Sequence, residues 1–525
     1  MQTIHSSDHV VVGGGINSLV AAAMLAGKGD SVALLERERR LGGCMHTAEI
    51  TLPGYRHDVM AATFVLFLTS PAFAELGGDL ARHGLEFCHS PYPTAVVRSD
   101  GSHLVFSTDR KANAASFDLL SKGDGDRHLA DMGELEANAD FLFSVLGGEI
   151  RSAKGMRRFA REAFKRSVKG LSSWAGSSLA PARGWLESSY RSELVQALWA
   201  PWVLHAGLTP ESTFGGQMGK VIAFALEAAG APVAKGGAGS AVRAFESLIA
   251  ERGGKIFRGE DARRVIVKRG RATGVETASG GVFNAAKSVI CSVAPGQLYG
   301  RLLKEHSFDE HGMASSFRHG RGNFQLHYAL NAPPAWKAGS LQDVALIHLA
   351  DGIDSVSKSC NEAERGMLPA SPTLCVGQPH ALDESRCPPG KAVLWIQVPD
   401  APRVIKGDAA GRIKTGSRWT QETREAFADR IESILAERIE NFQEISLARR
   451  AYSPADLEAL NANLVGGDPY GGACTVDQLL FWRPFANSGG ASTPVKRLFH
   501  IGASTHPGPG LSGGSGYNLA KTLGA

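Results

Sequence analysis

The most informative pattern of apolar and polar positions lies at the N-terminus. Residues 10–12 form a short apolar run typical of a buried strand, and the glycines 13–15 follow it directly. Segment 19–26 is rich in alanine and has the composition of a buried helix, and the apolar segment 31–35 predicts a second strand that ends at Glu36. The order is therefore strand, glycine turn, helix, strand.

This order has the chemistry of a dinucleotide site. Gly13 permits a tight turn, and Gly15 lets the backbone approach a pyrophosphate. The helix that follows offers N–H groups and the positive end of its dipole to phosphates. Glu36 stands at the strand end, where a carboxylate accepts hydrogen bonds from ribose hydroxyls and repels a 2′-phosphate. Ser18 replaces the usual third glycine and is small enough for close packing of the helix on the strand.

The segment after Glu36 favours FAD over NAD. Arg37 opens a stretch that ends in Gly42 and Gly43, and in many flavoproteins such a segment runs along the FAD diphosphate. Cys44 stands where those proteins continue with a basic residue. The salt bridge that a basic residue would make from this position is therefore missing, or another residue of the chain supplies the positive charge.

Three further segments resemble one family. Residues 42–47 lead to Leu-Pro-Gly-Tyr-Arg-His-Asp at 52–58, the glycine-rich stretch 232–240 opens a helix, and a second glycine-rich stretch fills 498–514. Together with the N-terminal motif they resemble the phytoene-desaturase-like FAD-dependent oxidoreductases. That group includes carotenoid desaturases and isomerases, retinol saturases and pyridine nucleotide-disulphide oxidoreductase domain-containing proteins. The resemblance covers both chain ends and one central block.

The resemblance implies an FAD site, residue by residue. Ala262 would contact the adenine side through its backbone, and Gly502 with residues 510–513 would lie beside the ribityl chain and the isoalloxazine. A glycine turn entering a helix, expected from about Tyr517, places N–H donors where reduction builds negative charge. The implied cofactor contacts are Gly13, Gly15, Ile16, Asn17, Ser18, Glu36, Arg37, Gly42, Gly43, Cys44, Ala262, Gly502, Gly510, Leu511, Ser512 and Gly513.

The predicted fold class is α/β, a Rossmann-type, amine-oxidase-like FAD-binding domain with an inserted α+β substrate domain. A chain of 525 residues exceeds what one hydrophobic core usually serves. Alternation predicts strands over 262–267 and 274–277, and residues 422–439 predict a helix. The expected boundaries are 1–105, 226–300 and 480–525 for the FAD-binding domain, and 106–225 and 301–479 for the substrate-binding cap.

Composition narrows the class of protein. The chain is 43% hydrophobic and 21% charged, and its net charge of +4 is too mild to indicate nucleic-acid binding. Seven scattered cysteines without a CxxC pair predict neither a disulfide framework nor a metal site, and indicate a cytoplasmic compartment. Because a strand is predicted almost at the start, we expect no signal peptide, and no apolar run is long enough to predict a membrane span.

No residue is identified as a catalytic base, because an apolar slot can align a C–H bond with a flavin. His506, in the C-terminal motif, either relays protons or bonds the turn backbone. Lys235 either approaches the cofactor or is solvated. His205 and His327 lie in the inserted regions and either line a substrate cavity or pack in a core. Cys44 is a reactive thiol or an inert packed one.

Residues 151–171 predict a basic amphipathic helix. They hold eight lysines and arginines against one acid, Glu162, with apolar residues near helical spacing. Such a helix either lies on an anionic membrane surface as a peripheral contact or exposes a solvated basic face.

The function expected is removal of hydride at flavin N5 from an apolar, unsaturated or aromatic small molecule. Neither a second glycine turn with its own strand and acid nor a redox cysteine pair is present in the sequence. The electron acceptor is therefore expected to be dioxygen or a quinone rather than a nicotinamide. The alternatives are an FAD-dependent amine or C–N oxidase and a binding protein that keeps the fold without redox turnover.

Overall fold

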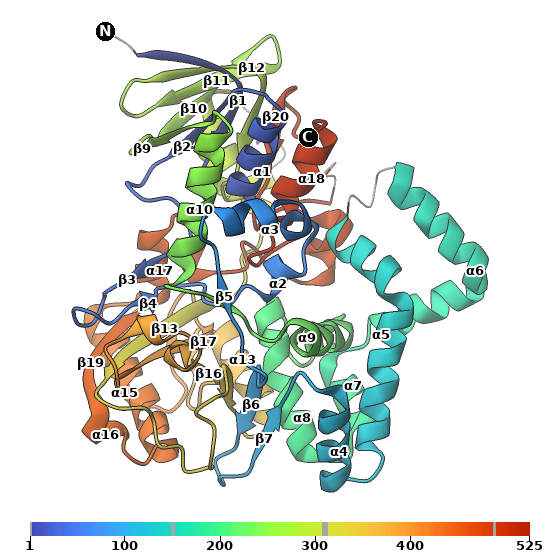
Figure 1. Ribbon diagram of the computed structural model, residues 1–525, viewed down its shortest axis with the longest axis vertical. Helices are drawn as coiled ribbons and strands as arrows, with labels where there is room; N and C mark the ends of the chain where they lie inside the picture. The colour runs from blue at the N-terminus through green and yellow to red at the C-terminus, as the bar shows by residue number, and fades with distance from the viewer. Residues whose placement is uncertain (1–2, 149–152, 307–312, 487–489) are drawn as a thin grey trace.

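The structure is a computed structural model that describes residues 3–148, 153–306, 313–486 and 490–525. Three parts are evident in Figure 1: a sheet with flanking helices at the top, a second sheet at the lower left, and a group of helices at the lower right. The first and last segments of the chain meet in the upper part, where both termini lie.

The first sheet has the order β10-β11-β12-β1-β2-β9, with β20 beside β12. The strands β9, β2, β1, β12 and β20 run parallel, whereas β10, β11 and β12 form an antiparallel meander. Its members are β1 (Ile4–Val12), β2 (Val32–Glu36), β9 (Lys255–Arg258), β10 (Ala262–Lys268), β11 (Arg271–Thr277), β12 (Val282–Cys291) and β20 (Leu498–His500).

Both faces of this sheet are covered, which explains the unbroken apolar run at the end of β1. Val11 packs in a core with helices α1 (Ile16–Gly27) and α10 (Ala238–Glu251), whereas Val10 and Val12 pack in a core on the opposite face. A parallel strand buried on both faces has no polar face to alternate with. The strand β1 is longer than the predicted run 10–12. Helix α1 begins at Ile16, three residues before the predicted start at residue 19.

The second sheet is largely antiparallel and has the order β19-β13-β17-β16-β14-β6-β7. Alternate residues of β13, such as Phe324 and Leu326, pack against helix α15 (Gln421–Arg438), which agrees with the helix predicted over 422–439. The opposite face of the sheet is directed to the centre of the molecule. The strands are β6 (Thr94–Val97), β7 (His103–Phe106), β13 (Gly322–Leu330), β14 (Leu346–Leu349), β16 (Leu374–Gly377), β17 (Ala392–Ala401) and β19 (Ser446–Tyr452).

One predicted domain boundary differs from the sheet pairing. The strands β6 and β7 fall within 1–105, which the sequence assigned to the FAD-binding domain, but β6 pairs with β14 in the second sheet. The reason is tertiary, because the partner strand β14 lies about 250 residues further along the chain. No local pattern in 94–106 records that pairing.

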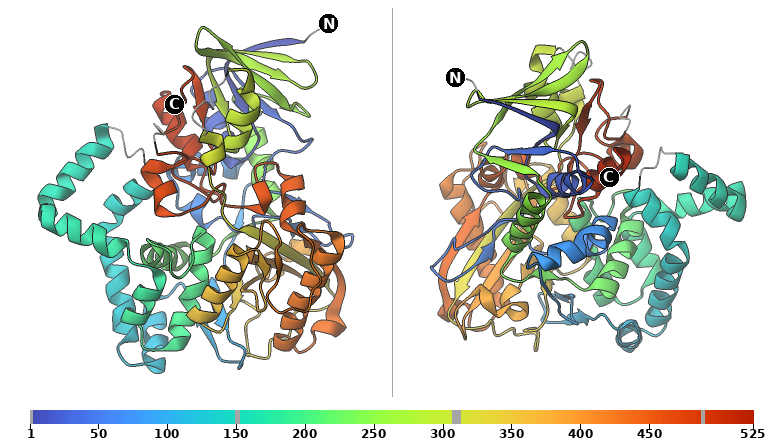
Figure 2. Two further views of the ribbon diagram at one scale, coloured as in Figure 1. Left: turned by 180° about the vertical axis from the view of Figure 1, so that it is seen from behind. Right: turned by 45° about the horizontal axis from the view of Figure 1, so that its top comes forward.

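The helical part covers most of 110–229 and projects furthest at α6 (Figure 2). The basic helix expected over 151–171 is found as α6 (Ala153–Ser178), but Ser167, with φ 62°, interrupts it. Residues 151 and 152 lie outside the described residues. The other helices here are α4 (Arg110–Leu120), α5 (Asp124–Gly147), α7 (Ala182–Ser189), α8 (Glu193–Trp199), η1 (Ala200–Ala206) and α9 (Gly215–Ala229).

Shorter helices close the gaps between these parts. They include α2 (Val65–Leu68), α3 (Pro71–Arg82), α13 (Ile353–Glu364), α17 (Pro454–Leu460) and α18 (Gly514–Thr522). Among the helices that the structure describes, none combines the length and the apolar character needed to cross a bilayer.

Candidate functional site

A large cavity connects the two sheets. Its volume is about 1500 Å³, above the range of about 300–1000 Å³ that is usual for one small ligand. One end is lined by the glycine turn after β1, and the other by the inner face of the second sheet and by helix α9. The cavity therefore has room for a dinucleotide and for a second molecule beside it.

The glycine turn is shaped by close contacts on one side and open space on the other. Gly13 has φ +96°, and a Cβ there would lie 2.9 Å from the carbonyl oxygen of Ser292. A Cβ on Gly14 would lie 2.6 Å from a methyl carbon of Leu41. At Gly15, by contrast, an added Cβ would meet no protein atom within 4 Å and would enter the cavity. The turn thus leaves a space against its backbone at Gly15.

Glu36 is buried at the end of β2 and lines the same cavity. One carboxylate oxygen accepts the N–H of Gly14 at 2.7 Å, and the other accepts the N–H of Glu38 at 2.9 Å. Burial raises the pKa of Glu36, and these two backbone donors oppose the shift. The side chain therefore anchors the turn itself, in addition to the ribose contact that the sequence predicts.

The segment predicted to follow the diphosphate lies against the turn. The N–H of Gly42 donates to the carbonyl oxygen of Gly14 at 2.8 Å. Cys44 lines the cavity, and burial raises the pKa of its thiol to about 11, so it is a neutral thiol. Arg40 also lines the cavity and donates to the carbonyl oxygen of Gly43 at 3.3 Å. It is a cation near the position where the sequence lacks one.

The C-terminal glycine motif is tied to the N-terminal helix by one chain of hydrogen bonds. The N–H of Gly502 donates to the hydroxyl of Ser515 at 2.8 Å, and that hydroxyl donates to Asn17 Oδ1 at 2.8 Å. Helix α18 begins at Gly514 rather than at about Tyr517 as predicted. The earlier start places Ser515 in its first turn, where it joins the two ends of the chain.

Most of the predicted cofactor contacts line this cavity. Ser18 and Gly513 do not: Ser18 is fully buried within α1, and a Cβ on Gly513 would lie 2.6 Å from a methyl carbon of Val20. Both positions serve helix packing. The predicted contacts on the cavity wall are Gly13, Gly15, Ile16, Asn17, Glu36, Arg37, Gly42, Gly43, Cys44, Ala262, Gly502, Gly510, Leu511 and Ser512.

Several lining residues were not predicted. Arg301 lines the cavity and donates to the carbonyl oxygen of Ala262 at 2.8 Å. Asn463 lies beside the glycine turn, because its amide oxygen accepts the N–H of Ala294 and its amide nitrogen donates to Ser292. Ser292 also lines the cavity, and of these three residues it alone could have been found from the sequence. It directly follows the strand β12, and ligands bind at the carboxyl ends of parallel strands.

These features fit an FAD molecule. The open space at Gly15, the N-terminus of α1 and the buried carboxylate of Glu36 are the parts that bind a pyrophosphate and a ribose. The cavity continues from them to the C-terminal glycine turn. Beyond this turn lies the part of the cavity under the second sheet and helix α9, which we call the chamber. When bound there, FAD would supply a two-electron acceptor at its N5.

The structure separates the four histidine and lysine candidates. Lys235 is exposed and pairs with Glu86, away from the cavity. His506 donates to the carbonyl oxygen of Gly148 at 2.7 Å, and burial lowers its pKa to about 4. His327 is fully buried among aromatic rings. Of the four, only His205 lines the cavity.

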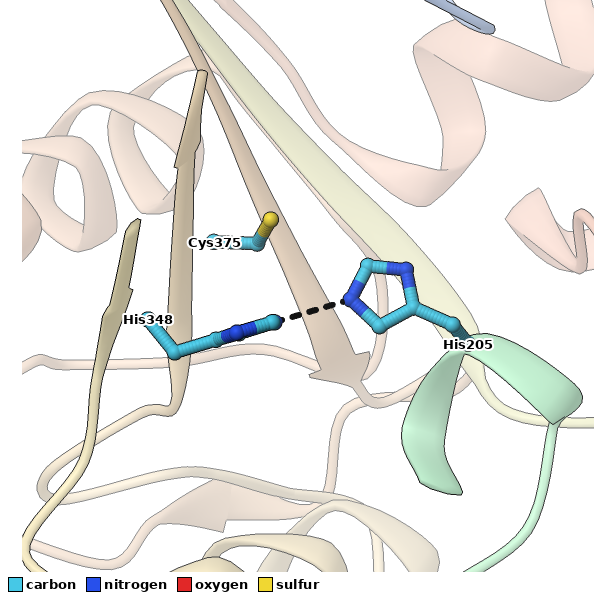
Figure 3. A group of neighbouring side chains, drawn as sticks. All are labelled: His205, His348 and Cys375. Carbon is cyan, nitrogen blue, oxygen red and sulfur yellow. Dashed lines mark hydrogen bonds between the residues drawn. The ribbon is translucent and has the colours of Figure 1, made fainter. Parts of the chain in front are cut away.

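Around His205 the chamber is apolar with a few polar groups. His205 Nε2 lies 2.9 Å from His348 Nε2, and Cys375 lies next to His348 (Figure 3). The second sheet adds three amides to the lining, Asn323, Gln325 and Gln397. Strand pairing places Gln325 opposite Gln397, which alternation along either strand alone does not reveal. The apolar lining includes Trp202, Met218, Val221, Ile222, Phe224, Leu346, Trp395 and Tyr470.

Comparison with known proteins matches part of the chain to a family description. Residues 11–79 match the NAD(P)-binding Rossmann-like domain. The matched segment contains β1, the glycine turn, α1, β2 and the stretch that lies against the turn.

Curated relatives align along almost the whole chain. The chain is 25% identical to one of the subunits of limonene dehydrogenase from Castellaniella defragrans, covering 100% of this chain and 95% of the relative. It is 27% identical to pyridine nucleotide-disulfide oxidoreductase domain-containing protein 2 of Mus musculus, covering 98% and 93%. A zeta-carotene-forming phytoene desaturase of Myxococcus xanthus is 24% identical, covering 96% and 90%.

Solved structures share the fold. An oxidoreductase from Methanosarcina mazei superposes with a TM-score of 0.60 at 15% identity, over 98% of this chain and 100% of that one. Cyclohexylamine oxidase from Brevibacterium oxydans gives a TM-score of 0.56 at 16% identity, over 98% of both chains. Both cover the two sheets and the helical part together, as predicted from the amine-oxidase-like fold class.

Proposed function

Because this chain belongs to the phytoene-desaturase-like family of FAD-dependent oxidoreductases, we propose that it dehydrogenates an apolar, unsaturated or aromatic small molecule. The observation that carries this proposal is the continuous cavity from the glycine turn to the chamber under the second sheet. A substrate in that chamber would lie beside the C-terminal glycine turn, where the flavin ring is expected. Dioxygen or a quinone would then reoxidise the flavin.

The chamber favours a neutral substrate. Its lining between Trp202 and Ala228, and its lining from the second sheet, contain no charged side chain among the described residues. His205 is neutral as well, because burial lowers its pKa to about 4. An alkylammonium ion against these walls would lose its hydration without gaining a counter-ion, because the acidic side chain that the described helical part adds to the cavity lining, Asp140 on α5, lies outside them. This disfavours the amine oxidase alternative, although amine oxidases share the fold.

The residues of the chain would bind and orient the substrate and exclude water, and the proton released with the hydride would be consumed again when oxygen or a quinone reoxidises the flavin. Trp202, Leu346 and Trp395 present flat or branched apolar surfaces to the chamber. A planar unsaturated molecule held against them has few orientations, which supplies the alignment that hydride transfer needs. The walls also keep water from the reacting carbon.

The experiment is anaerobic reduction of the FAD-loaded protein, followed by the flavin absorbance. A panel of terpenes, polyenes, aromatic alcohols, apolar ketones and amines is mixed with the protein. We expect bleaching by neutral apolar compounds and none by amines. Bleaching by amines with release of hydrogen peroxide in air would establish the oxidase alternative. A panel that leaves a fully loaded flavin oxidised would favour a binding protein without redox turnover.

The proposed acceptor has its own test. A protein that uses NADH or NADPH needs a place for the nicotinamide against the flavin, usually with a second phosphate-binding turn. Reduction of the bound flavin by either nucleotide should therefore be slow and non-saturating in stopped-flow absorbance. Reoxidation by oxygen or by a soluble quinone should be fast. Rapid, saturable bleaching by a nicotinamide would overturn this part of the proposal.

We also propose that α6 rests on an anionic membrane surface, from which an apolar substrate would enter. Phe164 is 93% exposed and Val168 is 78% exposed, and Lys165 and Lys169 lie beside them. Arg158 of the same helix lines the cavity, so the helix reaches the space proposed for the substrate. Exposed apolar side chains among lysines and arginines are typical of helices that lie in a bilayer interface.

Vesicle flotation tests this contact. The double variant Phe164→Ser, Val168→Ser should lose binding to vesicles of phosphatidylglycerol and phosphatidylcholine, and wild-type binding should weaken as salt is raised. Leu119→Ser is the matched control, because Leu119 is 88% exposed on α4. Equal binding by the double variant and the control would contradict a contact through α6.

A further inference from the structure

A small polar cluster covers one part of the apolar chamber. His348 on β14 and Cys375 on β16 are direct cross-strand partners, so both side chains lie on the same face of the second sheet. His205 approaches that face from η1, and its ring points toward His348 (Figure 3). His348 and Cys375 are 1% exposed, whereas His205 lines the cavity.

The two imidazoles share one proton between them. Their Nε2 atoms lie 2.9 Å apart, which is a hydrogen bond in which one ring donates and the other accepts. The ring of Trp202 packs against both, with centroid distances of 4.5 and 4.9 Å. Burial lowers the pKa of both histidines, so each ring is neutral near pH 7 and carries a single N–H.

The surroundings of His348 decide which ring donates. Its Nδ1 is buried and has no hydrogen-bond partner within the described part of the chain. If the proton of His348 lay on Nδ1, a bare N–H would be buried, and unpaired buried donors are rarer than unpaired acceptors. The proton therefore lies on Nε2, which donates to His205. His205 must then carry its own proton on Nδ1.

The Nδ1–H of His205 is the group left for a ligand. Figure 3 shows this second ring nitrogen on the side of the ring away from the hydrogen bond to His348. The residue forms part of the cavity wall, so a molecule in the chamber can reach this nitrogen. A neutral imidazole held as a donor in an apolar pocket selects ligands that offer an acceptor.

We propose that His205 donates its Nδ1–H to a carbonyl oxygen of the substrate, so that the natural substrate class is apolar ketones or enones rather than pure hydrocarbons or amines. His348 is the positioning residue that fixes the tautomer of His205. This inference rests on the proposed function, because it names the class of substrate for the same chamber.

A metal ion is the competing explanation for the cluster. The donor atoms of His205, His348 and Cys375 lie within 4.8 Å of one another. Two nitrogens bound to one tetrahedral zinc ion, at about 2.0–2.1 Å each, would be about 3.3 Å apart. The observed 2.9 Å is shorter and is the separation of a hydrogen-bonded pair. The geometry thus favours the imidazole pair, and metal content becomes an outcome of the test.

The test is a binding measurement on the FAD-loaded protein with three ligands of equal shape. These are 4-phenylcyclohexanone, the hydrocarbon in which a methylene group replaces its oxygen, and 4-phenylcyclohexylamine. Binding is followed by perturbation of the flavin spectrum. One neutral hydrogen bond predicts that the ketone binds about 2- to 12-fold more tightly than the hydrocarbon. The amine should bind most weakly.

Variants locate the effect. In His205→Phe, which keeps a ring but removes the donor, the ketone and the hydrocarbon should bind equally. His348→Phe should reduce the preference, because the tautomer of His205 is no longer fixed. Cys375→Ala is the control for a metal site and should keep the wild-type preference. Circular dichroism and FAD content show that each variant is folded.

The outcomes separate the two proposals. Equal binding of all three ligands by the wild type, no binding of the ketone, or an unchanged preference in His205→Phe would overturn the role of His205. So would a stoichiometric transition metal in the purified protein that Cys375→Ala removes. A ketone preference without bleaching by any compound would support this inference while refuting dehydrogenation.

Discussion

The two seven-stranded sheets meet the same cavity in different ways. The first presents the carboxyl ends of its parallel strands, where Gly13, Glu36 and Ser292 reach the cavity wall. The second presents a flat face, from which side chains such as Gln325 and Gln397 project. One region offers mostly backbone groups at strand ends to the cavity, and the other offers side chains from neighbouring strands.

This difference explains why the sequence indicates the cofactor but not the substrate. Backbone recognition of a phosphate needs glycine at fixed places in one short segment, so its requirements lie close together in the sequence. Recognition by a sheet face needs only that each strand offers one side chain, and those strands are far apart in the chain. Cofactor choice is therefore a local property here, and substrate choice is a tertiary one.

The largest effect should come from filling the space at Gly15. Its φ of −75° and ψ of 172° suit any residue, and a side chain there would enter the cavity without touching protein. Gly15→Val should fold normally yet bind FAD about a hundredfold more weakly or worse, a loss of about 2.7 kcal/mol. Fluorescence titration of the apoprotein with FAD measures this.

The matched control is Gly78→Ala. Gly78 lies in α3, and an added Cβ there also meets nothing within 4 Å. It should leave FAD affinity unchanged and raise the melting temperature slightly, because alanine is the better helix former. Full FAD affinity in Gly15→Val would contradict the placement of the diphosphate.

A smaller loss is expected at the end of β2. Glu36→Ala removes a charged acceptor worth about 1.5–3 kcal/mol, so FAD affinity should fall about ten- to a hundredfold. It also frees the N–H groups of Gly14 and Glu38, so the apoprotein should melt at a lower temperature. Glu36→Gln retains one acceptor oxygen, so its FAD affinity should lie between those of the wild type and Glu36→Ala. Unchanged affinity in both variants would show that the ribose is bound elsewhere.

Acid should lower the stability of the first and the second sheet to a similar extent, because a neutral histidine is buried at each of them. Burial lowers the pKa of His57, near the second sheet, to about 3, and that of His500, on β20, to about 4. The unfolded chain binds a proton near pH 6.5, so stability falls as the pH drops from about 6.5 toward 4, by up to about 1.4 kcal/mol per unit for each histidine.

Melting temperatures at pH 7.5 and 5.0 measure this slope. His57→Gln and His500→Gln should each flatten it while lowering stability at pH 7.5. A slope that neither variant changes would mean that the two imidazoles are protonated in the folded protein. A slope that changes in only one variant would show which region loses stability first in acid.

The smallest effect is expected from replacing one tryptophan on each face of the second sheet. Trp395 donates to the carbonyl oxygen of Met60 at 3.1 Å on the cavity face, whereas Trp419 donates to Pro402 at 2.8 Å on the side of the α15 core. Trp395→Phe and Trp419→Phe should each lose about 0.5–1.5 kcal/mol of stability. Only Trp395→Phe should change the rate of flavin bleaching, and neither should change FAD affinity. Equal bleaching rates in the two variants would contradict a substrate chamber on the inner face.

The sequence by itself determined the nucleotide half of this protein. The strand and glycine turn near Gly13, the acid at Glu36 and the C-terminal glycines all follow from short-range requirements of backbone shape and charge. The helix 422–439 and the strands 262–267 and 274–277 likewise follow from local periodicity. Each of these features depends on residues that are neighbours in the chain.

Only the tertiary structure decided the substrate half. Strand pairing assigned β6 and β7 to the second sheet, brought Gln325 opposite Gln397, and set His348 beside Cys375. It also selected His205 from the four histidine and lysine candidates, which the sequence could not rank. The physical reason is that long-range pairing is fixed by burial of whole faces, and a single histidine in an apolar segment carries no record of which face it will meet.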